Sequence, residues 1–173
     1  MTKGGPLLIR SIITCLLIVI SLLVITFTLA FPHYTHIVTI EKQYDFGPLN
    51  QYKQSIITEA KHNNIEPELI AAVIYHESRG MWNAHGRHGE IGLMQIMPYP
   101  ERQPNKLWDP DFNIKWGSHY LAGLVRARGT RGGLSAYNAG PDGYYQTAYV
   151  ESVLRYYAVY ATNTKTVFQM TFL

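Results

Sequence analysis

The segment PELIAAVIYHES, residues 67–78, sets the main expectation for the fold. It opens with a proline, which suits the first turn of a helix. Ile70, Val73 and Ile74 recur at spacings of three and four, which predicts a helix with one apolar face. Glu77 continues that spacing, so its carboxyl group is expected on the same face, where burial would raise its pKa. Such an acid is typical of enzymes that protonate a leaving oxygen, although a helix-end glutamate that turns to solvent has the same spacing.

Three further helices are predicted around this segment. The first begins at Pro48 and ends at Asn63-Asn64, the second follows an N-cap at Asp109, and the third covers about residues 145–160. Residues 80–92 are rich in Gly and His and are expected to form a loop. The predicted inward faces of the three helices are aromatic and aliphatic: Leu49, Tyr52, Ile56 and Ala60; Phe112, Trp116, Tyr120 and Leu124; Tyr149, Val153, Tyr156 and Tyr160. The body of the protein is therefore expected to be mainly α.

An apolar run stands near the N-terminus. Residues 11–31 are 21 consecutive positions without a charge, which is the length of a bilayer-spanning helix. Lys3 and Arg10 precede the run, so the positive-inside tendency predicts residues 1–10 in the cytoplasm and the body outside. We expect an uncleaved transmembrane anchor or uncleaved signal, in a single-pass protein of the bacterial inner membrane with its body in the periplasm, or in a phage membrane. A signal peptide cleaved after residues 28–30 is the alternative.

The composition limits the partners. After Lys3 and Arg10 are set aside, 13 of the 15 basic residues remain against 12 acidic ones, so the body is almost neutral. A nucleic-acid-binding domain would need a clustered basic face, and we expect no nucleic-acid partner. Hydrophobic residues make up 47% of the 173 positions, which is enough for one compact core. That core is expected in residues 48–160, with 32–47 as a tether and 161–173 as a tail of undetermined structure.

No metal or other cofactor is expected. Cys15 is the single cysteine, so neither a disulfide nor a zinc site made of cysteines can form within one chain. The pair His76-Glu77 begins a zinc-protease pattern, but Gly80 stands where the second histidine would be required. His85 and His88 are three residues apart in a glycine-rich loop, and no third ligand is evident.

Four short motifs follow one another in the body: Glu77-Ser78, Gly92–Pro98 (GLMQIMP), Ala136–Pro141 (AYNAGP) and Tyr149-Val150. In this order they resemble the four signatures of the soluble lytic transglycosylases, a family related to goose-type lysozyme. The resemblance covers about residues 48–160. It implies a lysozyme-like α-helical domain, here preceded by the transmembrane helix, with a cleft for peptidoglycan.

The resemblance also implies roles for individual residues. The catalytic glutamate of the family corresponds to Glu77, and the residues that orient its carboxyl group correspond to Ser78 and Tyr149. The sugar-contacting positions correspond to Met94, Gln95, Tyr137 and Asn138. The implied reaction is cleavage of the β-1,4 bond between N-acetylmuramic acid and N-acetylglucosamine with formation of a 1,6-anhydro end. Glu77 would act first as the acid and then as the base.

Several features depart from the family or leave alternatives open. Tyr99-Pro100 replaces a common threonine-alanine pair, and His76 precedes the glutamate where glutamine is more frequent. Glu90 or Asp142 as a second carboxylate would favour a lysozyme-type hydrolase, and an inactive glycan-binding scaffold module is an alternative of another class. The setting is open between wall turnover, a secretion or conjugation machine, and phage entry, with partners in an envelope-spanning machine or a virion.

Overall fold

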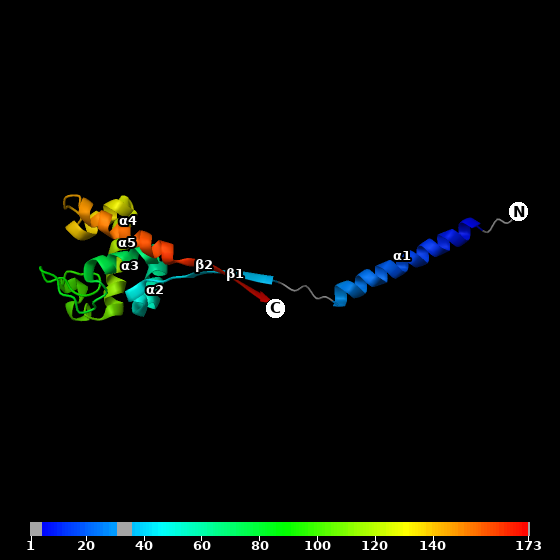
Figure 1. The fold of residues 1–173 in the computed structure, drawn as a ribbon, viewed down its shortest axis with the longest axis horizontal. Helices are drawn as coiled ribbons and strands as arrows, with labels where there is room; N and C mark the ends of the chain where they lie inside the picture. The colour runs from blue at the N-terminus through cyan, green and yellow to red at the C-terminus, as the bar shows by residue number, and fades with distance from the viewer. Residues whose placement is uncertain (1–4, 31–35, 173) are drawn as a thin grey trace. The chain divides into compact units, whose positions relative to one another are not determined.

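The computed structural model describes residues 5–30 and 36–172. Residues 1–4 of the expected cytoplasmic segment, residue 31 of the expected anchor and residues 32–35 of the expected tether lie outside the described residues. In chain order the elements are α1 (Gly5–Ala30), β1 (His36–Gln43), the 3-10 helix η1 (Gly47–Tyr52), α2 (Lys53–Asn63), α3 (Pro67–Ser78), the 3-10 helices η2 (Pro100–Arg102) and η3 (Pro104–Lys106), α4 (Pro110–Ala139), α5 (Thr147–Asn163) and β2 (Lys165–Phe172) (Figure 1).

The chain divides into two compact units, and the smaller one contains α1. It comprises Met1–Glu41 together with Phe168–Leu173, and the larger unit comprises Lys42–Val167. Apolar side chains of α1, such as Leu16 and Leu23, are exposed. Among the described residues, no helix is both long enough and apolar enough to cross a membrane.

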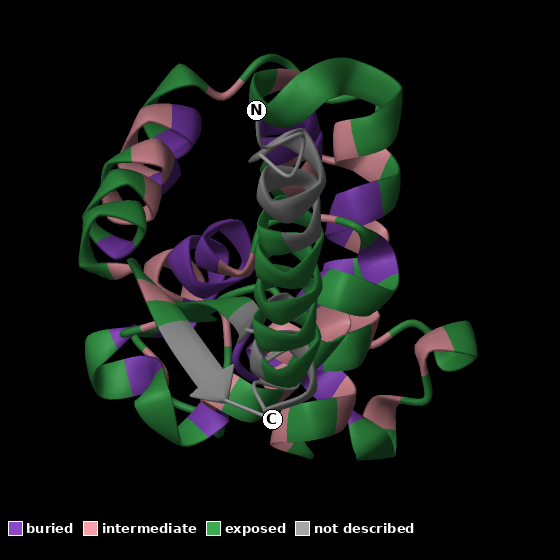
Figure 2. Ribbon diagram, turned by 90° about the vertical axis from the view of Figure 1, so that its right-hand side faces the viewer, coloured by how far each residue is buried: buried purple, intermediate pink, exposed green. Residues whose placement is uncertain are grey.

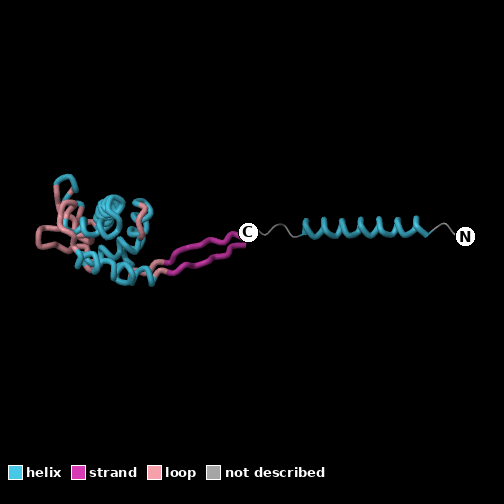
Figure 3. Tube along the Cα trace, turned by 90° about the horizontal axis from the view of Figure 1, so that it is seen from above, coloured by secondary structure: helices cyan, strands magenta, loops and turns pink. Residues whose placement is uncertain are grey.

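Strands β1 and β2 pair with each other in a two-stranded sheet (Figure 3). The part of the tether from His36 onward therefore contains a strand, as its β-branched residues favour. The C-terminal tail after Asn163 contains its partner strand. The sequence left that tail undetermined because the pairing joins segments more than 120 residues apart, which no local pattern reports.

Helix α3 is the centre of the larger unit. Residues 69–74 are all at most 4% exposed, and α3 packs against α2 and α5. Figure 2 shows the buried residues in purple. The predicted helix is confirmed with its start at Pro67, but the expectation of one apolar face was too narrow. The positions outside the predicted apolar stripe are also apolar, namely Leu69, Ala71 and Ala72. The helix is therefore apolar on almost every side and is buried accordingly.

The segment before α3 forms η1 followed by α2, where the sequence predicted one helix from Pro48. Its predicted inward residues Leu49, Tyr52, Ile56 and Ala60 are all buried. The helix ends as expected at Asn63, because Asn64 adopts the left-handed conformation (φ 54°) and its N–H donates to the carbonyl of Ala60.

Helix α4 begins as predicted but buries a different face. The Asp109 carboxylate accepts from the N–H of Phe112 at 2.8 Å, which confirms the cap. The expected inward aromatic residues, among them Trp116 and Tyr120, are only half-buried. The face turned to the core is made of smaller and polar residues: Asn113, Ile114, Gly117, Ser118, Leu121 and Ala122. The prediction followed the large aromatic residues, whereas close packing against the loop before α4 requires small ones.

Two features complete the larger unit. Gly129 (φ 69°) breaks the helical path of α4, so the segment carrying residues 136–139 is a separate helical piece. Helix α5 packs against α3, and its Tyr149, Val153 and Tyr160 are buried as predicted. Tyr156, also predicted to face inward, is only half-buried, and its hydroxyl accepts from Arg79. Between α3 and α4 runs a long loop, green in Figure 1, in which Ile91 forms isolated bridges to His85 and Ile96.

Candidate active site

Glu77 lies in the last turn of α3, and the helix ends immediately after it. Arg79 adopts the left-handed conformation (φ 56°) and its N–H donates to the carbonyl of Tyr75. Gly80 follows with φ 83°, and a Cβ there would come within 2.7 Å of Leu49. The hydroxyl of Tyr52 donates to the carbonyl of Gly80 at 3.2 Å, which holds this turn against η1. The end of the helix is therefore fixed by backbone conformation and packing together.

The carboxyl group of Glu77 is partly buried and makes one close polar contact. The phenol of Tyr149 donates to its Oε1 at 2.6 Å. Burial raises the pKa of Glu77 to about 7, the hydrogen bond from Tyr149 opposes this rise, and the negative charge of Glu90 adds to it. At neutral pH the carboxyl group is therefore divided between its acid and its ionised form, as a group that must both give and take a proton requires.

Tyr149 is held in place by the helix on which Glu77 lies. Its ring packs edge-to-face against His76 with 4.6 Å between the ring centroids. Nδ1 of His76 lies 3.0 Å from the hydroxyl of Ser152, one turn further along α5. Burial, followed by the charges of Arg79 and Arg155, lowers the pKa of His76. Burial raises the pKa of Tyr149 well above its ordinary value, so its phenol remains protonated and serves as a donor.

The second motif forms a turn that is tied to α4 by one buried amide. Asn113 is 0% exposed; its Oδ1 accepts from the N–H of Met94, and its Nδ2 donates to the carbonyls of Ile91 and Leu107. Gly92 has φ 77°, and a Cβ at that position would overlap the amide of Asn113. Asn113 therefore satisfies three backbone groups of the loop at once, which fixes the position of the second motif relative to α4.

Met94 and Gln95 occupy different places in this turn. The side chain of Met94 is fully buried, and its Sδ lies near Gly117, where a Cβ would come within 2.5 Å. Gln95 is half-buried with φ 49°, and its Nε2 donates to the carbonyls of Ala84 and Gly92. The amide of Gln95 is therefore the more accessible polar group of the two.

The third motif brings Tyr137 to this turn. Its hydroxyl donates to the carbonyl of Met94 at 2.8 Å. Burial raises the pKa of Tyr137, and the charge of Glu77 raises it further, which places Tyr137 within electrostatic reach of the glutamate. Asn138, the next residue, is exposed. The structure thus brings Glu77, Tyr149, Tyr137 and the Met94 backbone into one neighbourhood, with Asn138 at the surface beside Tyr137.

Ser78 does not hydrogen-bond to Glu77 in the described contacts. Its hydroxyl donates to the carbonyl of Ile74 at 3.1 Å and accepts from the N–H of Gly80 at 3.2 Å. It therefore fastens the last turn of α3 and the backbone that follows. Any influence of Ser78 on the carboxyl group passes through the helix end.

The two candidate second carboxylates differ in their surroundings. Oε2 of Glu90 accepts from the backbone N–H of His88 at 2.9 Å, and Oε1 lies 3.2 Å from its Nδ1. Burial alone would raise the pKa of Glu90, but hydrogen bonds from its own backbone N–H and from His88 lower it overall, so Glu90 is ionised at neutral pH. Asp142 is exposed.

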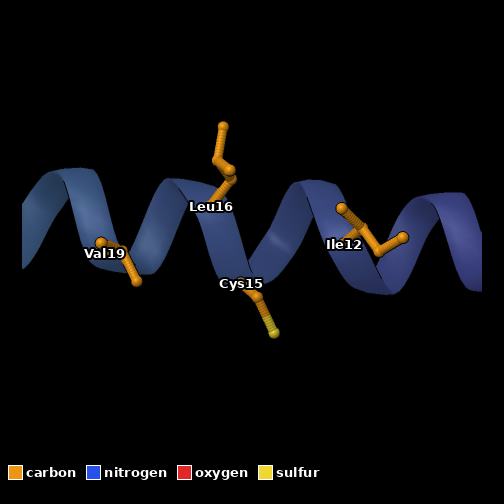
Figure 4. Close-up of a pocket in the computed structure, with 4 residues that line it drawn as sticks. All are labelled: Ile12, Cys15, Leu16 and Val19. Carbon is orange, nitrogen blue, oxygen red and sulfur yellow. The ribbon is translucent and has the colours of Figure 1, made fainter.

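A cluster of metal ligands or the apolar hollow on α1 would be a further candidate site. In residues 5–30 and 36–172, no group of three or more His, Cys, Asp or Glu side chains could hold a metal ion. Ile12, Cys15, Leu16 and Val19 line a hollow along α1, and Figure 4 shows them projecting from that single helix. Apart from the thiol of Cys15, these side chains are aliphatic, and no carboxyl group or amide lies among them.

Some residues of this neighbourhood were not singled out as site residues from the sequence. Asn113 and Arg102 were assigned no role from the sequence, and His76 was noted only as a departure from the family. Their contacts join segments far apart in the chain, such as Asn113 with Met94, and only a paired substitution pattern among relatives could have revealed them.

The site thus combines a carboxyl group of raised pKa, a tyrosine that donates to it, and the amides of Gln95 and Asn113 in and beneath the neighbouring turn. The model of the family described as "Transglycosylase SLT domain" matches residues 54–160. The chain belongs to this family.

Solved and curated relatives agree with this assignment. Lysozyme g of Gallus gallus is 33% identical over 114 residues, covering 56% of this chain and 52% of that protein. Lysozyme g of Struthio camelus is 28% identical over 112 residues, covering 56% of this chain and 54% of that protein. The chain therefore spans about half the length of these curated relatives. An inactive glutamate-to-glutamine mutant of the lytic transglycosylase Slt from Pseudomonas aeruginosa superimposes with a TM-score of 0.58 and 25% identity, covering 66% of this chain and 24% of that one.

Proposed function

We propose that this protein is a peptidoglycan lytic transglycosylase. It would cleave the β-1,4 bond between N-acetylmuramic acid and N-acetylglucosamine and leave a 1,6-anhydro end. The observation that carries the proposal is the carboxyl group of Glu77, whose pKa is raised to about 7 and whose Oε1 accepts from Tyr149. Membership of the transglycosylase SLT domain family supports the same activity.

One carboxyl group is sufficient for this reaction. Protonated Glu77 gives its proton to the glycosidic oxygen as the bond from that oxygen to C1 of the muramyl residue breaks. The N-acetyl group of the substrate stabilises the positive charge at C1. Ionised Glu77 then takes the proton of the 6-hydroxyl as its oxygen bonds to C1, which restores the acid without consuming water. Tyr149 supports the ionised stage, because a phenol donor stabilises a carboxylate.

The choice of an internal hydroxyl over water rests on proximity. The 6-hydroxyl belongs to the sugar that is already bound, and well-oriented intramolecular groups can reach effective molarities of about 10⁵–10⁸ M. Glu90 is the observation that favours the alternative, a lysozyme-type hydrolase, since its charge reaches Glu77. Contacts with His88 hold both oxygens of Glu90 against its own loop, so only their remaining lone pairs could orient a water molecule. Retention of the Glu77–Tyr149 pair speaks against an inactive scaffold module.

Replacing Glu77 by glutamine tests the catalytic assignment. Glutamine keeps the shape but cannot supply a proton as an acid does, so clearing of a peptidoglycan suspension should slow by about 10²–10⁴-fold or more. Because Gln carries no charge to bury, the variant should melt at pH 8 at a temperature no lower than the wild type. Glu59→Gln on α2 is the matched control and should clear at the wild-type rate. Full activity of Glu77→Gln would overturn the assignment.

The mass of the products tests the type of reaction. Muropeptides from the wild-type digest should carry 1,6-anhydro-N-acetylmuramic acid, which is lighter by one water than the hydrolysed form. A digest dominated by the heavier, reducing form would identify a lysozyme. Glu90→Gln and Asp142→Asn would then be the first variants to assay.

We further propose that residues 11–31 attach the enzyme to the bacterial inner membrane, with the larger unit in the periplasm, or to the membrane of a phage particle. The support is the sequence alone: 21 uncharged residues behind Lys3 and Arg10. Such an anchored enzyme would open the wall locally, for turnover, for an envelope-spanning secretion or conjugation machine, or for phage entry with virion components as partners.

A further inference from the structure

The loop that follows the second motif carries an arginine held among aromatic rings. The guanidinium carbon of Arg102 lies 4.5 Å from the ring centroid of Tyr99, 4.5 Å from that of Trp116 and 5.7 Å from that of Tyr120. Nη1 donates to the carbonyl of Met97 at 3.3 Å. We call the side chains of Arg102, Tyr99, Trp116 and Tyr120 the Arg102 cluster. Their contacts fix the plane of the guanidinium group between a loop residue and the outer face of α4.

The positive charge of this cluster has no anionic partner among the described residues. The ion pairs there join His88 to Glu90 and Arg131 to Glu151, and neither involves Arg102. Its neighbour Glu101 is exposed and forms no ion pair with it. The aromatic rings cover the faces of the guanidinium group and leave its edge open to a ligand. Of its five N–H donors, one donates to the carbonyl of Met97. The remaining donors are arranged to bind a carboxylate.

The cluster lies beside the candidate active site. The rings of Tyr120 and Tyr137 are 5.6 Å apart, and the hydroxyl of Tyr137 donates to the carbonyl of Met94. The charges of both Arg102 and Glu77 act on the phenol of Tyr137, one lowering and the other raising its pKa. A glycan strand bound at Glu77 would therefore extend within reach of Arg102.

The proposed substrate carries a suitable anion at a regular position. The sugar rings of peptidoglycan are uncharged, but every muramyl residue bears a lactyl group. That group ends in a free carboxylate or is joined to a stem peptide that contains carboxylates. Unsubstituted N-acetylglucosamine polymers have no such group. An unpaired, half-buried cation beside the site thus matches the substituent that distinguishes the two kinds of glycan.

We infer that the guanidinium of Arg102, stacked between Tyr99 and Trp116, binds a carboxylate of the lactyl or peptide branch of the muramyl residue. This inference rests on the proposed function. It makes the Arg102 cluster a specificity element of the enzyme, distinct from the groups that break the bond. The simpler alternative is that Arg102 only clamps the loop at Tyr99 onto α4, and that alternative involves no charge on the ligand.

The test compares charged and neutralised glycan strands with the full chain in a mild detergent. The substrates are soluble strands with stem peptides, the same strands freed of peptide by an amidase, and both preparations after methyl esterification of their carboxylates. The variants are Arg102→Gln, Arg102→Lys and, as a control, Lys61→Gln, which removes one exposed charge on α2. For each combination of protein variant and substrate we would measure kcat and KM.

The expected result is a KM for Arg102→Gln raised roughly tenfold on carboxylate-bearing strands, with kcat within about twofold of the wild type. On esterified strands the variant and the wild type should be indistinguishable. Arg102→Lys should recover part of the loss, and Lys61→Gln should show none. A rise in KM confined to peptide-bearing strands assigns the carboxylate to the stem peptide. A rise in KM confined to strands freed of peptide assigns it to the lactyl group.

Two outcomes would overturn the inference. An equal rise in KM on charged and esterified strands would show that Arg102 only holds the loop at Tyr99 against α4. An unchanged KM on every strand would show that the Arg102 cluster does not contribute to binding. Binding of the same strands to the Glu77→Gln protein, with and without Arg102→Gln, separates this question from catalysis. If the wild type cleaves none of these strands, the proposed function fails, while the binding comparison still decides whether Arg102 recognises a carboxylate.

Discussion

The carboxyl group of Glu77 is subject to two opposing influences. Burial favours its neutral form, whereas the phenol of Tyr149 favours its ionised form. A pKa of about 7 against 4.5 in the unfolded chain corresponds to about 3 kcal/mol, by which ionised Glu77 destabilises the fold. Because this pKa is raised, stability is greatest below about pH 4.5 for this group and is lost as pH rises toward 7 and above. The protein thus retains a residue that costs stability, which is common at catalytic sites.

Removing the phenol of Tyr149 should change the pH dependence of the reaction. Glu77 must be protonated to act as the acid, so kcat/KM should fall as pH rises through about 7. In Tyr149→Phe the hydrogen bond that lowers this pKa is absent, and the alkaline limb should move to higher pH. The maximal rate should fall roughly tenfold to a hundredfold, because the ionised stage loses a donor.

Rate measurements between pH 5 and 9 would check this expectation. Tyr144→Phe is the matched control, since Tyr144 is 92% exposed and its phenol contacts no catalytic group. A Tyr149→Phe enzyme whose alkaline limb stays in place would show that Tyr149 does not set the pKa of Glu77.

At the scale of elements, the turn of the second motif depends on one glycine and one asparagine. Gly92 is left-handed and lies against the amide of Asn113, which in turn bonds to the backbone at Met94, Ile91 and Leu107. A side chain at position 92 would therefore strain the backbone and displace the amide that organises the loop. The glycine of this motif serves close approach as well as conformation.

Gly92→Ala should consequently destabilise the protein more than an equally left-handed glycine in the same loop. Gly89 has φ 96° and open space around its Cα, so Gly89→Ala should cost only the conformational strain, about 1 kcal/mol. Gly92→Ala adds a steric overlap, and we expect a total loss of roughly 2–4 kcal/mol. Urea denaturation of the two variants measures the difference. Equal losses would indicate that Asn113 gives way at no cost.

The elements that the sequence predicted correctly are those with local signals. Pro67 and the spacing of Ile70 to Ile74 predicted α3, and Asp109 predicted the start of α4, because caps and periodicity act within a few residues. The predicted inward face of α4 was wrong, since Trp116 and Tyr120 are only half-buried and contact Arg102. The pairing of β1 with β2 and the bond of Asn113 to Met94 depend on distant contacts and could not be predicted from local patterns.

For the candidate site, too, local sequence patterns identified some features, whereas others depend on contacts between distant segments. Glu77, Tyr149 and Tyr137 were located through short motifs, and the structure places them near one another. The sequence does not indicate that Ser78 bonds to the helix end, or that Met94 is fully buried. A motif specifies which residue types occur, whereas their orientation depends on the packing of α3, α4 and α5.

At the scale of the whole molecule, the candidate catalytic residues and the apolar N-terminal run fall in different units. Every residue of the candidate site lies in Lys42–Val167, and residues 11–31 lie in the other unit. The SLT family match at residues 54–160 falls entirely within the larger unit. Catalysis and membrane attachment are therefore separable hypotheses, and each can be tested without disturbing the residues that carry the other.

Membrane attachment should depend on residues 11–31 alone. The full chain, expressed in bacteria, should remain in membranes after a carbonate wash, whereas a chain of residues 42–173 should be released. A full-length Leu16→Arg, Ile20→Arg double variant is the sharper control. It keeps the length and the larger unit, but each arginine near the middle of a spanning helix costs about 2.5–3.5 kcal/mol. Protease added to spheroplasts should digest the larger unit of the wild type if it faces the periplasm. Release of the wild-type chain by carbonate would refute the anchor and favour a cleaved signal, and Glu77 chemistry would stand unaffected in the released protein.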